Sequence, residues 1–275
     1  MSLEFIETGT YGTEASWTPS SGTFRVVSWN INRGHCLEQI IDFLRSADAE
    51  LILLQECDLN AARSGSRNVA REIAQRLNMN YVFGVEFIEH SQGQSALHGQ
   101  ATLGRTELSN TRVLRFQQQS NFWKPRWFLP NHSRLQRRSG GRMALVTETS
   151  VQGRTVAIYN LHLESRNGDD LRIRQLSEIL DDTNQHEPDI PILIAGDFNF
   201  NVTRGAAGAN IRSAQFRNPF AEQAEHWTTQ SSRLRASRAI DWVLIRGTIR
   251  SEGSSVHSLT PGSDHYPLSL EIHHE

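Results

Sequence analysis

Cysteine is scarce in this chain of 275 residues, which contains only Cys36 and Cys57. Two cysteines cannot form the disulfide framework of a small secreted protein, and they favour a reducing compartment, although a single bridge between them stays open. No apolar run approaches the length of a membrane span, and the N-terminal "MSLEFIETGT" lacks the basic and apolar regions of a signal peptide. We therefore expect a cytoplasmic protein.

Lysine is almost absent, since Lys124 is the only one, and the net charge is −2. This balance argues against a protein held on nucleic acid by bulk charge alone. The charge is uneven, however, because no acidic residue lies between Glu107 and Glu148. The basic residues of that interval are Arg112, Arg115, Lys124, Arg126, Arg134, Arg137, Arg138 and Arg142. Guanidinium groups suit bidentate contacts with phosphate.

Residues 112–142 form a basic aromatic segment around "NFWKPRWF". Within "NFWKPRWF", the aromatic residues Phe122, Trp123, Trp127 and Phe128 are interleaved with Lys124 and Arg126. Aromatic faces beside guanidinium groups suit stacked bases and a phosphate backbone. They equally suit a lipid headgroup interface, and a solvated loop with scattered arginines is a third interpretation.

Short apolar runs alternate with amphipathic stretches along the chain, which predicts an α/β fold. The expected strands include residues 24–30, 51–56 and 190–195, and the expected helices are residues 36–47, 66–77 (with Ser66 as N-cap) and 167–182. No linker is long enough to divide the chain. We expect an irregular lead-in over residues 1–22 and a single domain over residues 23–275.

Polar side chains lie where the expected strands end. The run before Gly196 leads to Asp197 and Asn199, which alternation along an extended chain places on the same side. The same pattern recurs at Asn30, Glu56, His162, Asp241, Asp264 and His265. Burying such groups without partners costs several kcal/mol each, so they need each other, an ion or solvent in a cleft. A shared site at one edge of the fold would meet that need.

The residue types at these positions indicate the chemistry of such a site. Carboxylate and amide oxygens without cysteine suit a hard cation such as Mg²⁺ or Mn²⁺. Histidine beside acids suits proton transfer and the stabilisation of a phosphate, and the His–His spacing of a zinc motif is missing. Metal-assisted hydrolysis of a phosphate ester is the economical inference.

The motifs "SWN", "LLQE", "HLES", "GDFN", "IDW" and "SDH" occur in an order that resembles the endonuclease/exonuclease/phosphatase superfamily. This group includes exonuclease III-like nucleases, DNase I, sphingomyelinases and inositol polyphosphate 5-phosphatases. The resemblance runs from about residue 24 to 272. It implies a four-layered α/β sandwich, in which two facing mixed β-sheets are flanked by helices.

The resemblance also implies a metal site. Glu56 would be the principal ligand of Mg²⁺, or of Mn²⁺, with Asn30 beside it. Asp264 would complete the metal region. Asn32 stands where some members have an aspartate that touches the metal, so its contribution here would be weaker.

Catalytic roles are implied for residues of the later motifs. Asp197 would orient or deprotonate the attacking water, and Asn199 would hold the phosphate. His265, oriented by Asp241, would bind phosphoryl oxygens. His162 would contact the phosphate or protonate the leaving oxygen. Separately from the resemblance, Arg142 starts an expected strand after two glycines, so we expect it near the mouth of the site, where it would touch the substrate.

The remaining positions carry weaker expectations. Gln100 stands where many members have an asparagine, and we expect it to support the site. The other histidines are expected on the surface, including His98 and His226. Arg238 is close enough in sequence to pair with Asp241 in an ordinary salt bridge.

The expected function is a metal-dependent phosphodiesterase, with nucleic acid as the expected substrate. A phosphorylated lipid or an inositol phosphate is the alternative substrate class. A binding or scaffold protein that kept the fold and lost catalysis is the third possibility, although the motif residues are intact. The sequence predicts no stable protein partner.

Overall fold

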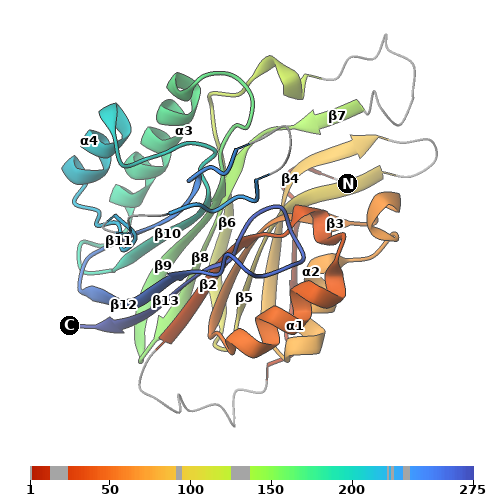
Figure 1. Cartoon of the computed structure of the whole chain (residues 1–275), viewed down its shortest axis with the longest axis horizontal. Helices are drawn as coiled ribbons and strands as arrows, with labels where there is room; N and C mark the ends of the chain where they lie inside the picture. The colour runs from red at the N-terminus through yellow and green to blue at the C-terminus, as the bar shows by residue number, and fades with distance from the viewer. Residues whose placement is uncertain are drawn as a thin grey trace.

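The computed structural model describes residues 2–12, 24–90, 95–124, 137–221, 223, 226–231 and 236–275. Two β-sheets pack face to face in this part of the chain, and helices lie outside them (Figure 1). Residues 125–136 of the basic aromatic segment lie outside the described residues, and they include Arg126, Trp127, Phe128 and Arg134.

The larger described sheet has the strand order β1-β4-β5-β3-β2-β13-β12, with β7 paired to β4. Its strands are β1 (Ile6–Gly9), β2 (Phe24–Asn30), β3 (Leu51–Leu59), β4 (Asn80–His90), β5 (Ser95–Gly104), β7 (Arg137–Gly140), β12 (Ile249–Val256) and β13 (Leu268–His274). β2 and β3 are parallel, whereas the other neighbours are antiparallel, so the sheet is mixed.

The smaller described sheet has the order β11-β10-β9-β8-β6. Its strands are β6 (Leu108–Arg115), β8 (Met143–Val151), β9 (Arg154–His162), β10 (Ile192–Asp197) and β11 (Asp241–Arg246). Only β9 and β10 are parallel here, so this sheet is mixed as well.

Helices cover the outer face of each sheet. α1 (Leu37–Ala47) and α2 (Val69–Leu77) pack on the larger sheet, and α3 (Asp169–Asp182) and α4 (Gly205–Ser213) pack on the smaller one. The order helix, sheet, sheet, helix confirms the predicted four-layered sandwich.

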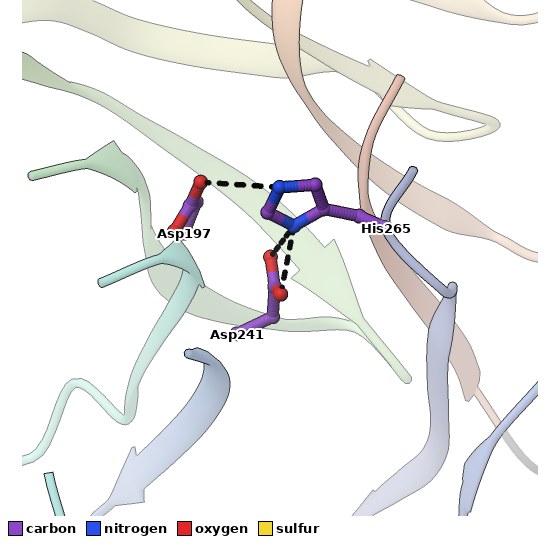
Figure 2. A group of neighbouring side chains, drawn as sticks. All are labelled: Asp197, Asp241 and His265. Atoms are coloured by element: carbon purple, nitrogen blue, oxygen red, sulfur yellow. Dashed lines mark hydrogen bonds and ion pairs between the residues drawn. The ribbon is translucent and has the colours of Figure 1, made fainter. Parts of the chain in front are cut away.

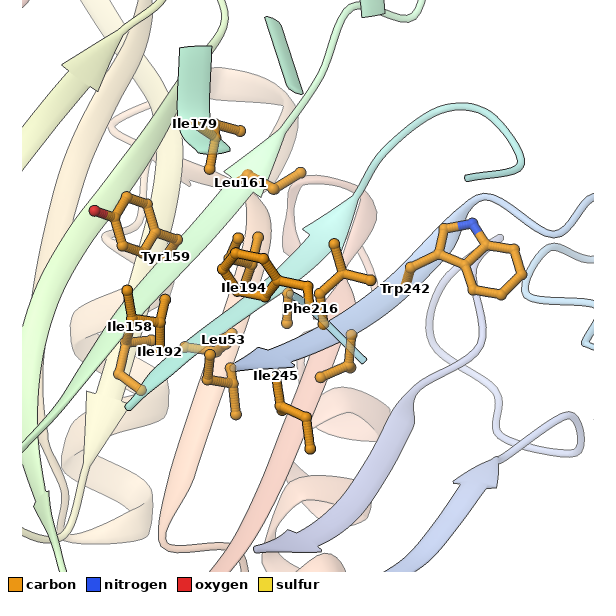
Figure 3. Close-up of a cluster of buried hydrophobic side chains, with 14 of the residues drawn as sticks. Leu53, Ile158, Tyr159, Leu161, Ile179, Ile192, Ile194, Phe216, Trp242 and Ile245 are labelled. Carbon is orange, nitrogen blue, oxygen red and sulfur yellow. The ribbon is translucent and has the colours of Figure 1, made fainter. Parts of the chain in front are cut away.

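Both faces of the central strands are buried, which explains their continuous apolar runs. On β2, Val26 belongs to the core between the sheets, whereas the next residue, Val27, packs with α1 and α2. On the smaller sheet, Ile194 lies in the apolar cluster that Figure 3 shows, together with Ile179 of α3. These central strands are therefore held between two apolar layers, which fixes the positions of the polar residues that they carry.

Two local expectations were wrong. Residues 1–22 are not irregular throughout, because Ile6–Gly9 form β1, which adds an antiparallel edge strand to β4. Ser66 does not cap α2, since its φ is 54° and the helix starts after Asn68, whose side chain accepts a hydrogen bond from Arg71 N at 3.0 Å. Asparagine is among the preferred N-cap residues, so position 68 supplies the cap two residues later.

Among the described residues, no helix is both long enough and apolar enough to cross a membrane.

Candidate active site

Three neighbouring strands of the smaller sheet bring polar side chains to one edge. In the β10 pairings, Asp197 is in register with His162 at the end of β9 and with Asp241 at the start of β11. The larger sheet adds Asn30 from the end of β2, whose Nδ2 donates to Asp197 Oδ2 at 3.0 Å. This hydrogen bond joins the two sheets at the edge where the sequence predicted a site.

His265 forms a hydrogen-bonded pair with Asp241 (Figure 2). Its Nδ1 lies 2.9 Å from Asp241 Oδ2, which also accepts the Thr228 hydroxyl at 2.6 Å. Its Nε2 faces Asp197 Oδ2 at 3.8 Å. Burial would lower the pKa of His265, but the Asp241 and Asp197 carboxylates outweigh it and raise this pKa to about 10. The imidazole is therefore a cation at neutral pH.

His162 lies on the other side of Asp197. Its Nε2 is 3.5 Å from Asp197 Oδ2, and its Nδ1 is 3.3 Å from Glu86 Oε2. Arg142 Nη1 donates to Glu86 Oε1 at 2.6 Å and lies 2.8 Å from His162 Nδ1. All four side chains are buried. Burial would raise the pKa of Glu86, but Arg142 and His162 lower it to about 2.

Glu86 is a site residue that the sequence analysis missed. It lies on β4, which is irregular between Val85 and Phe87. Gln100 donates to Glu86 Oε2 at 3.0 Å, so this position does contact the site. The available signal was an acid inside the otherwise apolar run "YVFGVEF".

Glu56 lies within β3, the strand that is parallel to β2. Asn30 pairs with Gln55 in the β2–β3 register, and the β3–β5 pairing is interrupted between Leu54 and Cys57. At this interruption, the φ of Glu56 is 56°, a strained value for a non-glycine residue. Burial would raise its pKa, but His98, His162, Arg33 and Arg142 lower it to about 2. The carboxyl is therefore ionised.

The loop after β10 departs from the expected geometry. The chain does not stay extended, because the φ of Asn199 is 60°. Asn199 N donates to Asp197 Oδ1 at 2.8 Å, and its Nδ2 donates to Leu163 O at 3.1 Å. Arg238 donates to Asn199 O at 2.8 Å. The Asp241 carboxylate binds His265 and Thr228. The salt bridge considered between Arg238 and Asp241 is therefore not found among the described residues.

Asp264 follows Ser263, whose Oγ donates to Asn30 O at 2.7 Å. Asp264 is exposed, and its carboxylate Oδ1 lies 3.5 Å from Ser263 Oγ. It makes no hydrogen bond or ion pair with Asn30 or Glu56 among the described residues.

Two histidines expected on the surface are buried. His98 is 3% exposed, and its Nδ1 lies 2.7 Å from Asp58 Oδ1. Arg63 binds both oxygens of Asp58, at 2.7 and 2.8 Å. His226 Nε2 lies 2.8 Å from Asp241 O. Sequence reasoning missed these contacts because a histidine in a polar stretch gives no local sign of burial.

Two groups of donors could hold a cation. The atoms of Asp197, Asp241 and His265 lie within 4.8 Å of one another. In that group, however, His265 Nδ1 and the Asp241 carboxylate are bound to each other. Asn30 and Glu56 offer oxygen donors, the type that Mg²⁺ and Mn²⁺ prefer. By the chemistry of their donor atoms, Asn30 and Glu56 therefore suit a hard divalent cation better than the hydrogen-bonded His265 and Asp241 do.

Comparisons with known structures give the same fold. The structure of an endonuclease/exonuclease/phosphatase from Beutenbergia cavernae has a TM-score of 0.69 and 16% identity, and the match covers 92% of this chain and 72% of that one. The human Nocturnin catalytic domain has a TM-score of 0.66 and 15% identity, with 98% of each chain covered. Humanized D. rerio TDP2 has a TM-score of 0.63 and 16% identity, with 92% and 100% covered.

A search of curated proteins finds no match to this chain. The model of the Endonuclease/Exonuclease/phosphatase family matches residues 27–265, which is most of the sequence. The chain therefore belongs to the endonuclease/exonuclease/phosphatase family, whose members hydrolyse phosphoester bonds.

Proposed function

We propose that this protein is a phosphodiesterase that hydrolyses nucleic acid by in-line attack of an activated water, with Mg²⁺ or Mn²⁺ as cofactor. One observation carries the proposal. A single carboxylate oxygen, Asp197 Oδ2, lies 3.0 Å from Asn30 Nδ2, 3.5 Å from His162 Nε2 and 3.8 Å from His265 Nε2. A proton acceptor thus stands between two imidazoles that can bind or protonate phosphate oxygens.

Asn30 and Glu56 would hold the cation, and Asp264, in the loop between β12 and β13, would add a carboxylate ligand. A bound divalent cation supplies positive charge that offsets the negative charge of the phosphoryl oxygens. The ionised state of Glu56 at neutral pH suits this role.

The protein residues then divide the remaining work. Asp197 orients the water and accepts its proton. His265, held in one orientation by Asp241, binds a phosphoryl oxygen as a cation. His162 donates a proton to the leaving oxygen.

Arg142 and Asn199 support this arrangement. Arg142 contacts His162 and adds positive charge beside the phosphate. We therefore assign Arg142 to substrate binding. Asn199 fixes the Asp197 carboxylate through its backbone N–H, and its side chain donates to Leu163 O, next to His162.

Nucleic acid is our preferred substrate class, because the arginines and aromatic rings that adjoin the site suit stacked bases and a phosphate backbone. The same groups suit a lipid headgroup, so the substrate panel below includes both classes. The human Nocturnin catalytic domain was solved with a bound sulfate anion, which resembles phosphate in shape and charge. A purely structural role is disfavoured, because Asp197, His162 and His265 keep the contacts that catalysis would need.

The test is hydrolysis by the full chain across a panel of substrates. The panel contains single- and double-stranded DNA, abasic DNA, RNA, sphingomyelin and inositol phosphates, each with Mg²⁺, Mn²⁺ or EDTA. We expect metal-dependent cleavage of nucleic acid that falls at least about 100-fold in Asp197→Asn, because the proton acceptor is lost. Asp189→Asn, an exposed residue before β10, is the matched control and should keep full activity.

Three outcomes would contradict parts of the proposal. Turnover of lipid or inositol phosphates alone would overturn the substrate class. Cleavage that survives EDTA or Asp197→Asn would overturn the mechanism. No turnover of any substrate would favour the non-catalytic scaffold.

A further inference from the structure

A stack of arginine side chains and aromatic rings leads from the catalytic centre to the surface. The Arg142 guanidinium carbon lies 5.1 Å from the centre of the Trp123 ring. Trp123 packs edge-on against Phe122, with ring centres 5.1 Å apart and an angle of 77°. The Arg166 guanidinium carbon lies 3.9 Å from the centre of the Phe122 ring. We call these four residues the arginine–aromatic stack.

The inner end of the stack is rigidly held. Arg142 is bound to Glu86 and lies beside His162, as described above, and its Nη2 donates to Ser165 Oγ at 2.9 Å. Trp123 is buried, and its Nε1 donates to Glu164 Oε2 at 2.9 Å. The stack therefore has a fixed position relative to the catalytic histidine.

The outer end of the stack is open and positively charged. Phe122 is half-buried and Arg166 is exposed. No carboxylate among the described residues pairs with the Arg166 guanidinium, because Glu164 is used by Trp123 and by the backbone N–H of Arg166. The Phe122 ring lies against the guanidinium, and among the described residues no side chain forms a hydrogen bond with that guanidinium.

This geometry matches the chemistry of a nucleotide. A guanidinium packed against an aromatic ring offers a stacking surface for a base, and its N–H groups can bind phosphate. We infer that the Phe122–Arg166 end of the stack binds a nucleotide next to the scissile phosphate of a single-stranded polynucleotide. The inference rests on the proposed function and adds to it a specific contact beyond the reacting phosphate.

Binding is tested by the fluorescence anisotropy of a labelled single-stranded oligonucleotide. All variants are made in the Asp197→Asn chain with Mg²⁺ present, so that the probe is not cleaved. Base stacking predicts that Arg166→Ala and Phe122→Ala each weaken binding about 10-fold. Arg166→Ala also lowers the slope of log Kd against log salt by about one, because one phosphate contact is lost.

Two matched variants separate stacking from charge. Arg166→Lys keeps the charge but not the plane, so we expect it to retain the salt slope and still lose several-fold in affinity. Arg154→Ala removes an exposed arginine at the start of β9, the opposite end of the strand from His162. It should bind as the Asp197→Asn chain does.

The inference is overturned if the oligonucleotide does not bind, or if Arg166→Ala and Phe122→Ala bind as tightly as Arg154→Ala. Binding of anionic phospholipid vesicles that is lost in Phe122→Ala, without binding of the oligonucleotide, would assign the stack to a membrane surface instead. The proposed function is judged separately by hydrolysis with Asp197 intact. If nucleic acid is cleaved but Arg166→Ala and Phe122→Ala bind the oligonucleotide normally, only the inference is overturned. If the two variants lose affinity as predicted but no nucleic acid is cleaved, only the proposed function is overturned.

Discussion

His265 shows how strongly neighbouring carboxylates can raise the pKa of a residue in this site. Asp241 and Asp197 flank the buried imidazole and raise its pKa to about 10. A group with a raised pKa carries its proton at every pH below that value. The charge needed to bind a phosphoryl oxygen is therefore present throughout the neutral range, and it depends on Asp241.

Asp241→Asn tests this dependence. Removing the Asp241 charge lowers the pKa of His265, so the imidazole loses its proton at a lower pH. We expect kcat/KM at pH 7 to fall at least about 100-fold, and the alkaline limb of the pH profile to move to lower pH. The measurement is kcat/KM between about pH 6 and 10, with the exposed Asp42→Asn as control. An alkaline limb that stays in place would contradict the role of Asp241.

At the scale of elements, the end of β10 depends on Gly196. Its φ is 144°, and a Cβ at this position would lie 2.0 Å from Leu161 O on β9. Only glycine fits, because the neighbouring backbone cannot move without breaking the β9–β10 pairing. That pairing sets Asp197 opposite His162.

Gly196→Ala is expected to destabilise the protein by about 3 kcal/mol, the combined cost of the backbone conformation and the steric clash. Urea unfolding measures this loss. Gly153→Ala is the matched control, since its φ is also positive, at 81°, but no atom lies within 4 Å of the added Cβ. Its cost should be limited to about 1 kcal/mol. Equal losses in the two variants would show that the close approach to Leu161 is unimportant.

At the scale of the whole molecule, buried amides connect the two sheets. Gln55 Nε2 donates to Asn160 Oδ1 at 2.8 Å, and Asn160 Nδ2 lies 3.2 Å from Leu54 O and 2.9 Å from Ala101 O. β3 and β5 belong to the larger sheet and β9 to the smaller one. These hydrogen bonds therefore help to fix how the sheets, and the site residues on them, lie relative to each other.

Asn160→Ala should leave these partners unsatisfied between the sheets. A buried polar group without a partner costs about 1–3 kcal/mol, so we expect a loss of about 3 kcal/mol in the free energy of unfolding. Asn184→Ala, at an exposed amide 3.4 Å from Arg246, should cost less than about 0.5 kcal/mol. Denaturant unfolding measures the free energy of unfolding of both variants. If Asn160→Ala loses as little stability as Asn184→Ala, the hydrogen bonds of Asn160 do not connect the two sheets in the way we expect.

Much of the architecture was predictable because its signals are local. Apolar runs and helical spacing located β2, β3, β10, α1 and α3 within a few residues. The four-layered fold followed from the resemblance of the motifs. β1 was not predictable, because a short edge strand is defined by its partner β4 and not by its own four residues.

The sequence by itself determined the family, the alternating strands and helices, and the polar residues at the ends of the strands. Only the tertiary structure decided which of them meet: it brought Asn30, His162 and His265 around Asp197, left Asp264 exposed, and added Glu86 and the His98–Asp58 pair. The physical reason is that periodicity and residue type act over neighbouring positions. The distance between two side chains on different strands depends instead on register, local irregularities and the packing of one sheet on the other.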